Sequence, residues 1–420
     1  MDNELQNNEP FDSAHDRQEI MTKNVSRRTF MGWAVAAVAG LVAACGERLG
    51  LAPTDTPPTS GPTPTWPPTW TPAPTDTPQP TATLVVSPTE VPAATAVLTD
   101  TPTPSQPTEA PSTTATDTPV PTAAPVSRAD VMRIYPEVKS RVVVVRHASA
   151  CSGPDDIAAD AVRQMLDAAI TDLTGIDDAQ RAWRTLFDPT ERIAIKVNTI
   201  SRYATSVPLA YAVAEKLQAI GVVAENIVIF DRRTDELQRV GYPINEDGPG
   251  VRCRATRGYR EPRDVAGTTQ QLSDILLDCD ALINLPLLKQ HGFSGLTFAM
   301  KNHYGSIDRP SAIHFDNCAP GIAQLNALPE IRDRTRLIIG DVLKICPANW
   351  NQAVVGNTLL MSFDPVAHDY VGMQILTDWL SANGGNPARV TGQAKHLATA
   401  AALGLGTDDP AHIEMRELAL

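Results

Sequence analysis

Several short motifs that mark cofactor and catalytic sites are missing from this sequence. It has no C-x-x-C pair, and the five cysteines after Cys45 are widely separated, which argues against a zinc ribbon, a ferredoxin-type cluster and a thioredoxin-like site. It also has no G-x-x-x-x-G-K-[ST] loop, no G-x-G-x-x-G after a predicted strand and no G-x-S-x-G elbow. P-loop phosphate binding and serine hydrolase chemistry are therefore disfavoured.

Basic tracts are missing as well. The formal net charge is −13, and −5 of it belongs to residues 127–420, where no basic tract occurs. We therefore expect no nucleic-acid partner.

The five cysteines after Cys45 are odd in number, and we predict that most of them are buried as small apolar side chains rather than paired in disulfides.

Large apolar side chains are scarce between residues 46 and 126. Of the 36 prolines in the chain, 20 lie between Ala52 and Val126, interleaved with threonine, serine and alanine. A segment of this composition cannot bury enough apolar surface to offset the entropy of ordering its backbone. We predict a disordered Pro/Thr-rich linker over residues 46–126.

An export signal is predicted at residues 1–45. The stretch SRRTFM at 26–31 resembles the twin-arginine signal pattern, and VAAC at 42–45 resembles a lipobox. These resemblances imply passage through the twin-arginine export machinery, acylation of Cys45, and a lipid anchor at the extracytoplasmic side of the cell membrane. The alternative is an uncleaved transmembrane anchor, for which the apolar run at 31–44 is short.

Residues 127–420 are predicted to form one α/β domain. Apolar runs of strand length alternate with helical patterns, and runs this apolar indicate strands buried on both faces. We expect a mostly parallel, doubly wound sheet flanked by helices, with an irregular insertion at about 232–264. The predicted strands cover 140–147, 191–198, 225–231, 281–288, 334–341 and 358–365, and the predicted helices include 154–173, 207–221 and 365–380.

Polar side chains follow these apolar runs. Ligands of open parallel sheets bind beyond the carboxyl ends of the strands, so such residues would form a polar rim. They are Lys196, Asn198, Asp231, Asn284, Lys289, His291, Asp341 and Asp364. Lys301 and Asn302 follow in a run whose glycines at 292, 295 and 305 permit positive φ and close backbone approach. Asp364, before Pro365, also fits the simpler role of a helix N-cap.

Lysines and asparagines gathered at one site suit an anion, because an ammonium supplies charge and an amide supplies a donor and an acceptor. Phosphate and carboxylate fit equally well. A lysine desolvated near other cations has a lowered pKa and can act as a base, so Lys289 and Lys301, with His291, are the catalytic candidates. A divalent metal held by histidines at 291, 303 and 314 with nearby aspartates is the alternative, although the spacing is not that of a helical zinc motif.

Five stretches of the chain resemble the DUF362 family, a domain of unknown function. They are IAIKVN (193–198), INLPLLKQH (283–291), LTFAMKNHYGSI (296–307), DPVAHD (364–369) and LGLGTDD (403–409). The resemblance implies an active-site-like cleft, onto which Lys196, Asn198, Lys289, His291, Lys301, Asn302, His314, Asp364 and Asp369 map. Many relatives carry a four-cysteine iron–sulfur insertion that this chain lacks, so no iron–sulfur cluster is expected.

Together these features predict an exported, lipid-anchored enzyme. It would bind an anionic small molecule and use a lysine or histidine in proton transfer or metal-assisted chemistry. One alternative is a tethered protein that binds an anion without reaction. The other is an accessory factor for redox or metal-centre proteins, which the missing cysteines disfavour.

Overall fold

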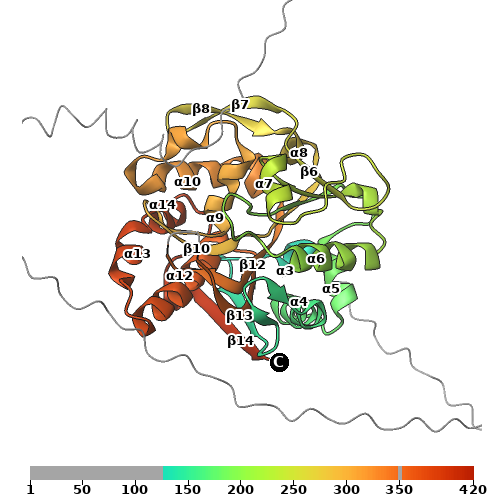
Figure 1. Ribbon diagram of the computed structural model, residues 1–420, viewed down its shortest axis with the longest axis horizontal. Helices are drawn as coiled ribbons and strands as arrows, with labels where there is room; N and C mark the ends of the chain where they lie inside the picture. The colour runs from blue at the N-terminus through green and yellow to red at the C-terminus, as the bar shows by residue number, and fades with distance from the viewer. Residues whose placement is uncertain (1–125, 349–351) are drawn as a thin grey trace, which may run out of the picture. The chain divides into compact units, whose positions relative to one another are not determined.

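The computed structural model describes residues 126–348 and 352–420, which form the α/β domain in Figure 1. The predicted signal sequence with Cys45, and the predicted linker up to residue 125, lie outside the described residues. Within the described ranges no helix is both long and apolar enough to span a bilayer. The five cysteines of these ranges are free and buried, as predicted.

The centre of the domain is a ten-stranded sheet, in which eight strands follow the order β14-β1-β13-β12-β9-β4-β5-β6. From β6 to β12 every neighbouring pair is parallel, whereas β13 runs antiparallel to both β12 and β1. The mostly parallel α/β fold is therefore confirmed. The eight strands are β1 Ser140–Arg146, β4 Ile193–Lys196, β5 Ile227–Asp231, β6 Arg252–Ala255, β9 Ala281–Asn284, β12 Thr335–Cys346, β13 Val354–Ser362 and β14 Ile413–Ala419.

Two further strands extend this sheet beside the carboxyl-terminal half of β12. Strand β10, Leu287–His291, runs parallel to β12, and β11, Gly295–Thr297, folds back antiparallel to β10. The apolar run predicted as a single strand is thus divided at Leu285–Pro286 into β9 and β10. Because of this division Lys289 and His291 lie within a strand, and not in the loop that the glycines suggested.

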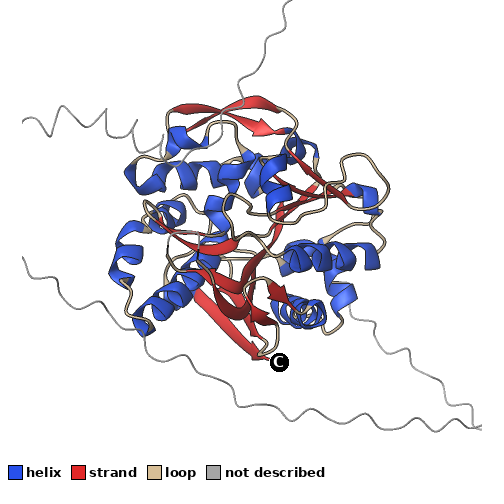
Figure 2. Ribbon diagram, in the orientation of Figure 1, coloured by secondary structure: helices blue, strands red, loops and turns tan. Residues whose placement is uncertain are grey.

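Helices cover both faces of the sheet (Figure 2). One buried apolar cluster joins the sheet to α4, α5 and α6, and a second joins it to α9, α10, α12, α13 and α14. Since residues such as Ile193, Ala194 and Ile195 are fully buried in turn, both faces of β4 are covered, which explains its unbroken apolar sequence. The helices are α4 Ala159–Thr174, α5 Ala179–Leu186, α6 Val207–Ala219, α9 Ala299–Asn302, α10 Ala319–Ala327, α12 Pro365–Ala382, α13 Pro387–Gln393 and α14 His396–Ala402.

The segment predicted as an irregular insertion contains regular elements. It includes helix α7, Thr234–Arg239, and the edge strand β6, and it ends in β7, Tyr259–Val265, which pairs with β8, Thr268–Ser273. Strand β6 has the sequence RCRA, in which only Cys253 and Ala255 are buried. Such a polar edge strand lacks the apolar run from which the other strands were predicted.

Helix α4 begins later than predicted. It starts at Ala159, because Asp156–Ile157 forms the short strand β3, which pairs with β2, Cys151–Gly153. Three more short α-helices lie in the described residues. They are α3 Arg128–Val131, α8 Asp274–Asp278 and α11 Pro329–Arg332.

Candidate functional site

Three neighbouring parallel strands end in polar side chains at one edge of the sheet. Lys196 ends β4, Asp231 ends β5 and Asn284 ends β9. The register pairs Lys196 with Phe230 on one side and with Asn284 on the other, so the three residues lie at the same level. We call this place the rim.

Lys196 and Asp231 form a buried ion pair at the rim, with Nζ 2.7 Å from Oδ1. Lys196 also donates to the carbonyl of Val197, at 2.6 Å. Asp231 accepts three further bonds, from the backbone amide and hydroxyl of Thr199 and from the amide of Arg232. This pair is saturated by protein groups, so its evident role is to fix the ends of β4 and β5.

Asparagine side chains connect this pair to helix α9. The amide of Asn302 donates to the carbonyl of Lys196 and to Oδ1 of Asn284, at 3.1 and 2.8 Å. Its oxygen accepts from Lys196 and from Asn198, at 3.4 and 3.3 Å. Asn284 donates in turn to the carbonyl of Ala299. The network therefore holds α9, which carries Lys301, against the rim.

Gly305 lies close above the ion pair. A side chain at this position would collide with Oδ1 of Asp231 and with the ammonium of Lys196. The close backbone approach expected of this glycine is confirmed, and Gly295 has the expected positive φ, +77°. Gly292 shows neither feature.

Lys289 is the candidate whose charge the protein compensates least. It is 1% exposed, and its ammonium donates to the hydroxyl of Ser201 at 2.7 Å. No carboxylate of the described residues lies within ion-pair distance of it. Burial lowers the pKa of Lys289 to about 8, against the opposing influence of Asp231 and Glu236. The amine is therefore mostly protonated at pH 7 and loses its charge as the pH rises through about 8.

Lys301, His291 and His314 lie together beside Tyr304. The ammonium of Lys301 is 3.2 Å from Nε2 of His314 and 3.7 Å from the centre of the Tyr304 ring. The rings of His291 and His314 have their centres 6.1 Å apart. Burial, followed by the charge of Lys301, lowers the pKa of both histidines, to about 3 for His314. Both imidazoles are thus neutral at pH 7.

The histidine tautomers follow from their backbone contacts. Nδ1 of His291 accepts from the amides of Phe293 and Ser294, each at 3.1 Å. A neutral ring that accepts at Nδ1 carries its proton on Nε2. The neutral ring of His291 therefore has its donor at Nε2.

Asp364 and Asp369 serve helix termini. Asp364 caps α12 by accepting from the amides of Val366 and Ala367, and its other oxygen accepts from Ser140 and Thr407. Since β13 is antiparallel, its carboxyl end lies where β1 begins, away from the rim. Asp369 accepts from the amides of Ala299 and Met300 and so fixes the start of α9. Of the two, only Asp369 supports the site.

Two buried charged residues near Lys289 were not predicted from the sequence. Glu236, on α7, is 9% exposed, and burial followed by the charge of Asp231 raises its pKa to about 7. Lys344, on β12, is 6% exposed. A lysine inside the apolar run LIIGDVLKIC was the available signal for Lys344, whereas the acidic, polar sequence of α7 resembles any surface helix.

Metal binding finds no support in the described ranges, 126–348 and 352–420. There, no three histidine, cysteine, aspartate or glutamate side chains are grouped so that they could hold a metal ion. His303, one of the proposed ligands, is fully buried and has a pKa of about 3, and its Nε2 is 3.2 Å from the amide nitrogen of Asn284. It belongs to the asparagine network.

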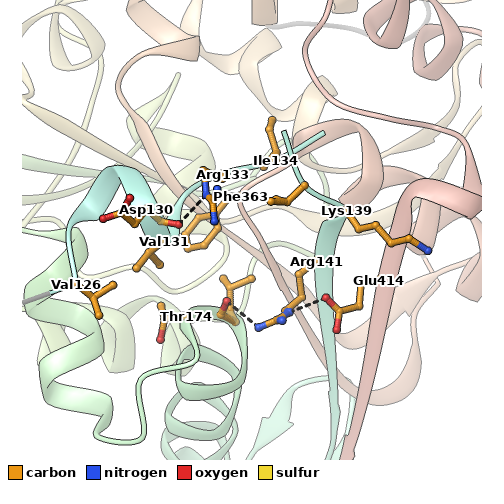
Figure 3. A pocket seen from close by; sticks show the side chains of 12 residues that line it. Val126, Asp130, Val131, Arg133, Ile134, Lys139, Arg141, Thr174, Phe363 and Glu414 are labelled. Atoms are coloured by element: carbon orange, nitrogen blue, oxygen red, sulfur yellow. Dashed lines mark hydrogen bonds and ion pairs between the residues drawn. The ribbon is translucent and has the colours of Figure 1, made fainter. Parts of the chain in front are cut away.

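A pocket of about 290 Å³ lies elsewhere in the domain, between α3, the start of β1, α4 and β14 (Figure 3). It is lined by charged side chains that include Arg133, Lys139 and Arg141. Arg141 pairs with Glu414 at 3.1 Å and donates to a carbonyl at the end of α4. The exposed Lys139 of this pocket contrasts with the buried lysines near the rim.

Residues 193–374 match the model of a family described as a domain of unknown function, DUF362. No curated protein matches the chain. Among solved structures, the lactate racemase apoprotein of Thermoanaerobacterium thermosaccharolyticum is 10% identical, with a TM-score of 0.28, over 50% of this chain and 51% of that chain. A structural-genomics protein from Thermotoga maritima is 8% identical, with a TM-score of 0.32, over 55% and 60%. The chain thus covers 51% of the first structure and 60% of the second. Structural similarity this low says nothing of a shared activity.

Proposed function

We propose that the α/β domain, in which residues 193–374 match the DUF362 model, binds a small anionic molecule beside Lys289 and acts on it by proton transfer. The observation that carries this proposal is the buried ammonium of Lys289, whose hydrogen-bond partner is a neutral hydroxyl. A buried charge without a counter-ion is costly, and a bound anion would offset that cost. His291 and Lys301 would supply a further donor and a further positive charge.

Proton transfer is supported by the pKa of the same amine. A group whose pKa lies near the working pH is effective as an acid or a base, and burial brings Lys289 to about 8. Glu236, with a pKa of about 7, is a second titrating group in its electrostatic neighbourhood. Two such groups near each other are typical of acid–base sites.

Replacing Lys289 with methionine tests the binding. We expect the purified chain to bind acetate or inorganic phosphate in calorimetry at pH 7, and Lys289→Met to weaken this binding about 10-fold or more, as for loss of a charged hydrogen bond. Because the variant loses only the contact with Ser201, its melting temperature should change little. The affinity of the parent should fall as the pH rises through about 8, since the amine loses its charge there.

Lys139→Met is the matched control for this experiment. Lys139 is an exposed lysine beside the pocket of Figure 3, and its loss should leave the affinity unchanged. Equal losses in both variants, or no binding by the parent, would overturn the proposal. A decline in affinity only above pH 10 would leave anion binding standing and remove Lys289 from proton transfer.

We also propose that the protein is exported by the twin-arginine machinery and held at the outer side of the cell membrane by a lipid on Cys45. The support is the sequence: Arg27 and Arg28 precede a short apolar run, and VAAC ends it. The Pro/Thr-rich residues 46–126 would then space the domain from the membrane surface.

Cys45→Ser tests the anchor. A protein held by a lipid on this cysteine should move from the membrane fraction to the soluble fraction when the cysteine is replaced, and Cys151→Ser should leave the distribution unchanged. Retention of Cys45→Ser in the membrane fraction would favour the uncleaved transmembrane anchor.

A further inference from the structure

A second buried lysine lies next to Lys289 on the neighbouring strand. Strands β10 and β12 are parallel, and the register pairs Lys289 with Cys346. Lys344 precedes Cys346 by two residues. The pairing of β12 is irregular before Lys344 and regular again from Lys344 to Ile345, so Lys344 and Cys346 project from the same side of β12. The two ammonium groups affect each other, since the charge of Lys344 contributes to the lowered pKa of Lys289. We call Lys289 and Lys344 the two-amine site.

Within the described residues the ammonium of Lys344 has no hydrogen-bond or ion-pair partner, although the side chain is 6% exposed. The charged or ionisable groups in its neighbourhood are Asp341, Cys151 and Cys346. Burial raises the pKa of both thiols to about 11, so neither supplies an anion at pH 7. Only Asp341 remains as a source of negative charge.

Asp341 is already engaged by backbone amides. Its Oδ2 accepts from the amide of Ser206 at 2.7 Å, and its Oδ1 accepts from the amide of Leu343 at 3.0 Å. Burial raises its pKa, and the charge of Lys344 acts against that rise, so this carboxylate already faces Lys344. The carboxylates near Lys289 are no better placed, because Asp231 forms its ion pair with Lys196. Glu236, the other carboxyl group near Lys289, is about half-ionised at pH 7. The two buried amines therefore carry more positive charge than the carboxylates near them balance.

Hydroxyl groups complete the surroundings. Lys289 donates to Ser201. Ser206, at the N-cap of the 13-residue helix α6, has its hydroxyl against Asp341 and lowers the pKa of that carboxyl group through a side-chain hydrogen bond. The first turn of α6 adds the positive end of a helix dipole.

We infer that Lys289 and Lys344 together bind a phosphate-type dianion, either inorganic phosphate or the phosphoryl group of a small monoester. This rests on the proposed function and names the class of its ligand. A dianion can meet both ammonium groups and still accept from the hydroxyl of Ser201, whereas a carboxylate brings one negative charge for two amines. The burial of both lysines excludes a polymer or a membrane surface as the source of the phosphate.

The full chain and Lys344→Met are compared in calorimetry at pH 7.5 with inorganic phosphate, methyl phosphate and acetate as probes. We expect the parent to bind a phosphate probe about 10-fold or more tightly than acetate. In Lys344→Met, phosphate affinity should fall about 10-fold or more, while acetate affinity stays within about 3-fold. Lys139→Met, with its lysine in the other pocket, should match the parent, and melting curves show whether each variant is folded.

The outcomes separate this inference from the proposed function. Binding of acetate but not phosphate by the parent, or equal weakening of both probes in Lys344→Met, overturns the dianion site and leaves anion binding at Lys289 intact. Binding of no probe overturns both. Tighter binding of methyl phosphate than of inorganic phosphate identifies a monoester as the ligand, and preference for inorganic phosphate identifies the free ion.

If Lys344→Met does not fold, Lys344→Arg provides the second test. Arginine keeps the charge but places it on a larger, planar group. A folded Lys344→Arg should keep the preference for phosphate over acetate. Loss of this preference with unchanged acetate affinity would mean that the charge at this position does not select the dianion.

Discussion

Gly406→Ala should destabilise the domain more than a glycine-to-alanine substitution at any other described glycine near a helix cap. A Cβ at this position would overlap the carboxylate of Asp364, which is fully buried. That carboxylate caps α12 and also binds Ser140 and the amide of Thr407. With φ at +147°, the backbone adds strain of its own. We expect a loss of about 3–5 kcal/mol in the free energy of unfolding, measured by urea denaturation.

Gly404→Ala is a control two residues away. Gly404 also has a positive φ, +72°, but a Cβ there would meet no atom within 4 Å. This variant should lose only the cost of placing alanine in the left-handed region, about 1 kcal/mol. Similar losses in the two variants would show that strain, and not contact with Asp364, makes glycine necessary at 406.

The strands were predictable because the sheet is buried on both faces. Runs such as IAI and IVIF have few polar residues to interrupt them, and each became a strand at the expected place. The edge strands β6 and β14 escaped prediction, since an edge that meets solvent carries polar side chains in alternation. Local composition therefore reveals the centre of this sheet better than its edges.

The candidate site was predictable only in part, because a polar residue after a strand can either line a ligand site or cap the next helix. Lys289 lies near Asp231 of the rim, and His291 lies near Lys301, as their positions after a predicted strand suggested. Asp364 follows a strand too, but that strand is antiparallel, so the same rule places its carboxylate at the far edge. Sequence alone does not give strand direction, and so it could not separate these cases.

Lys196→Met is expected to produce the second large effect, and it decides between two roles of Lys196. In the first role the lysine binds a ligand, as its place after a strand suggested. In the second it neutralises Asp231, with which it forms an ion pair whose side chains are 1% and 5% exposed. The saturated contacts of the pair favour the second role. Removing one partner of a buried pair leaves an uncompensated charge, so we expect a loss of about 3–5 kcal/mol in urea denaturation.

Lys216→Met provides the comparison, because Lys216 pairs with Asp167 at the same distance, 2.7 Å, but on the surface, with side chains 18% and 44% exposed. Solvent screens such a pair, so its loss should cost at most about 1 kcal/mol. Adding Asp231→Asn to Lys196→Met removes the uncompensated charge and should restore part of the stability, whereas Asp167→Asn should change Lys216→Met little. If Lys196→Met were as stable as Lys216→Met but bound acetate or phosphate more weakly than the parent, Lys196 would belong to the ligand and not to the framework.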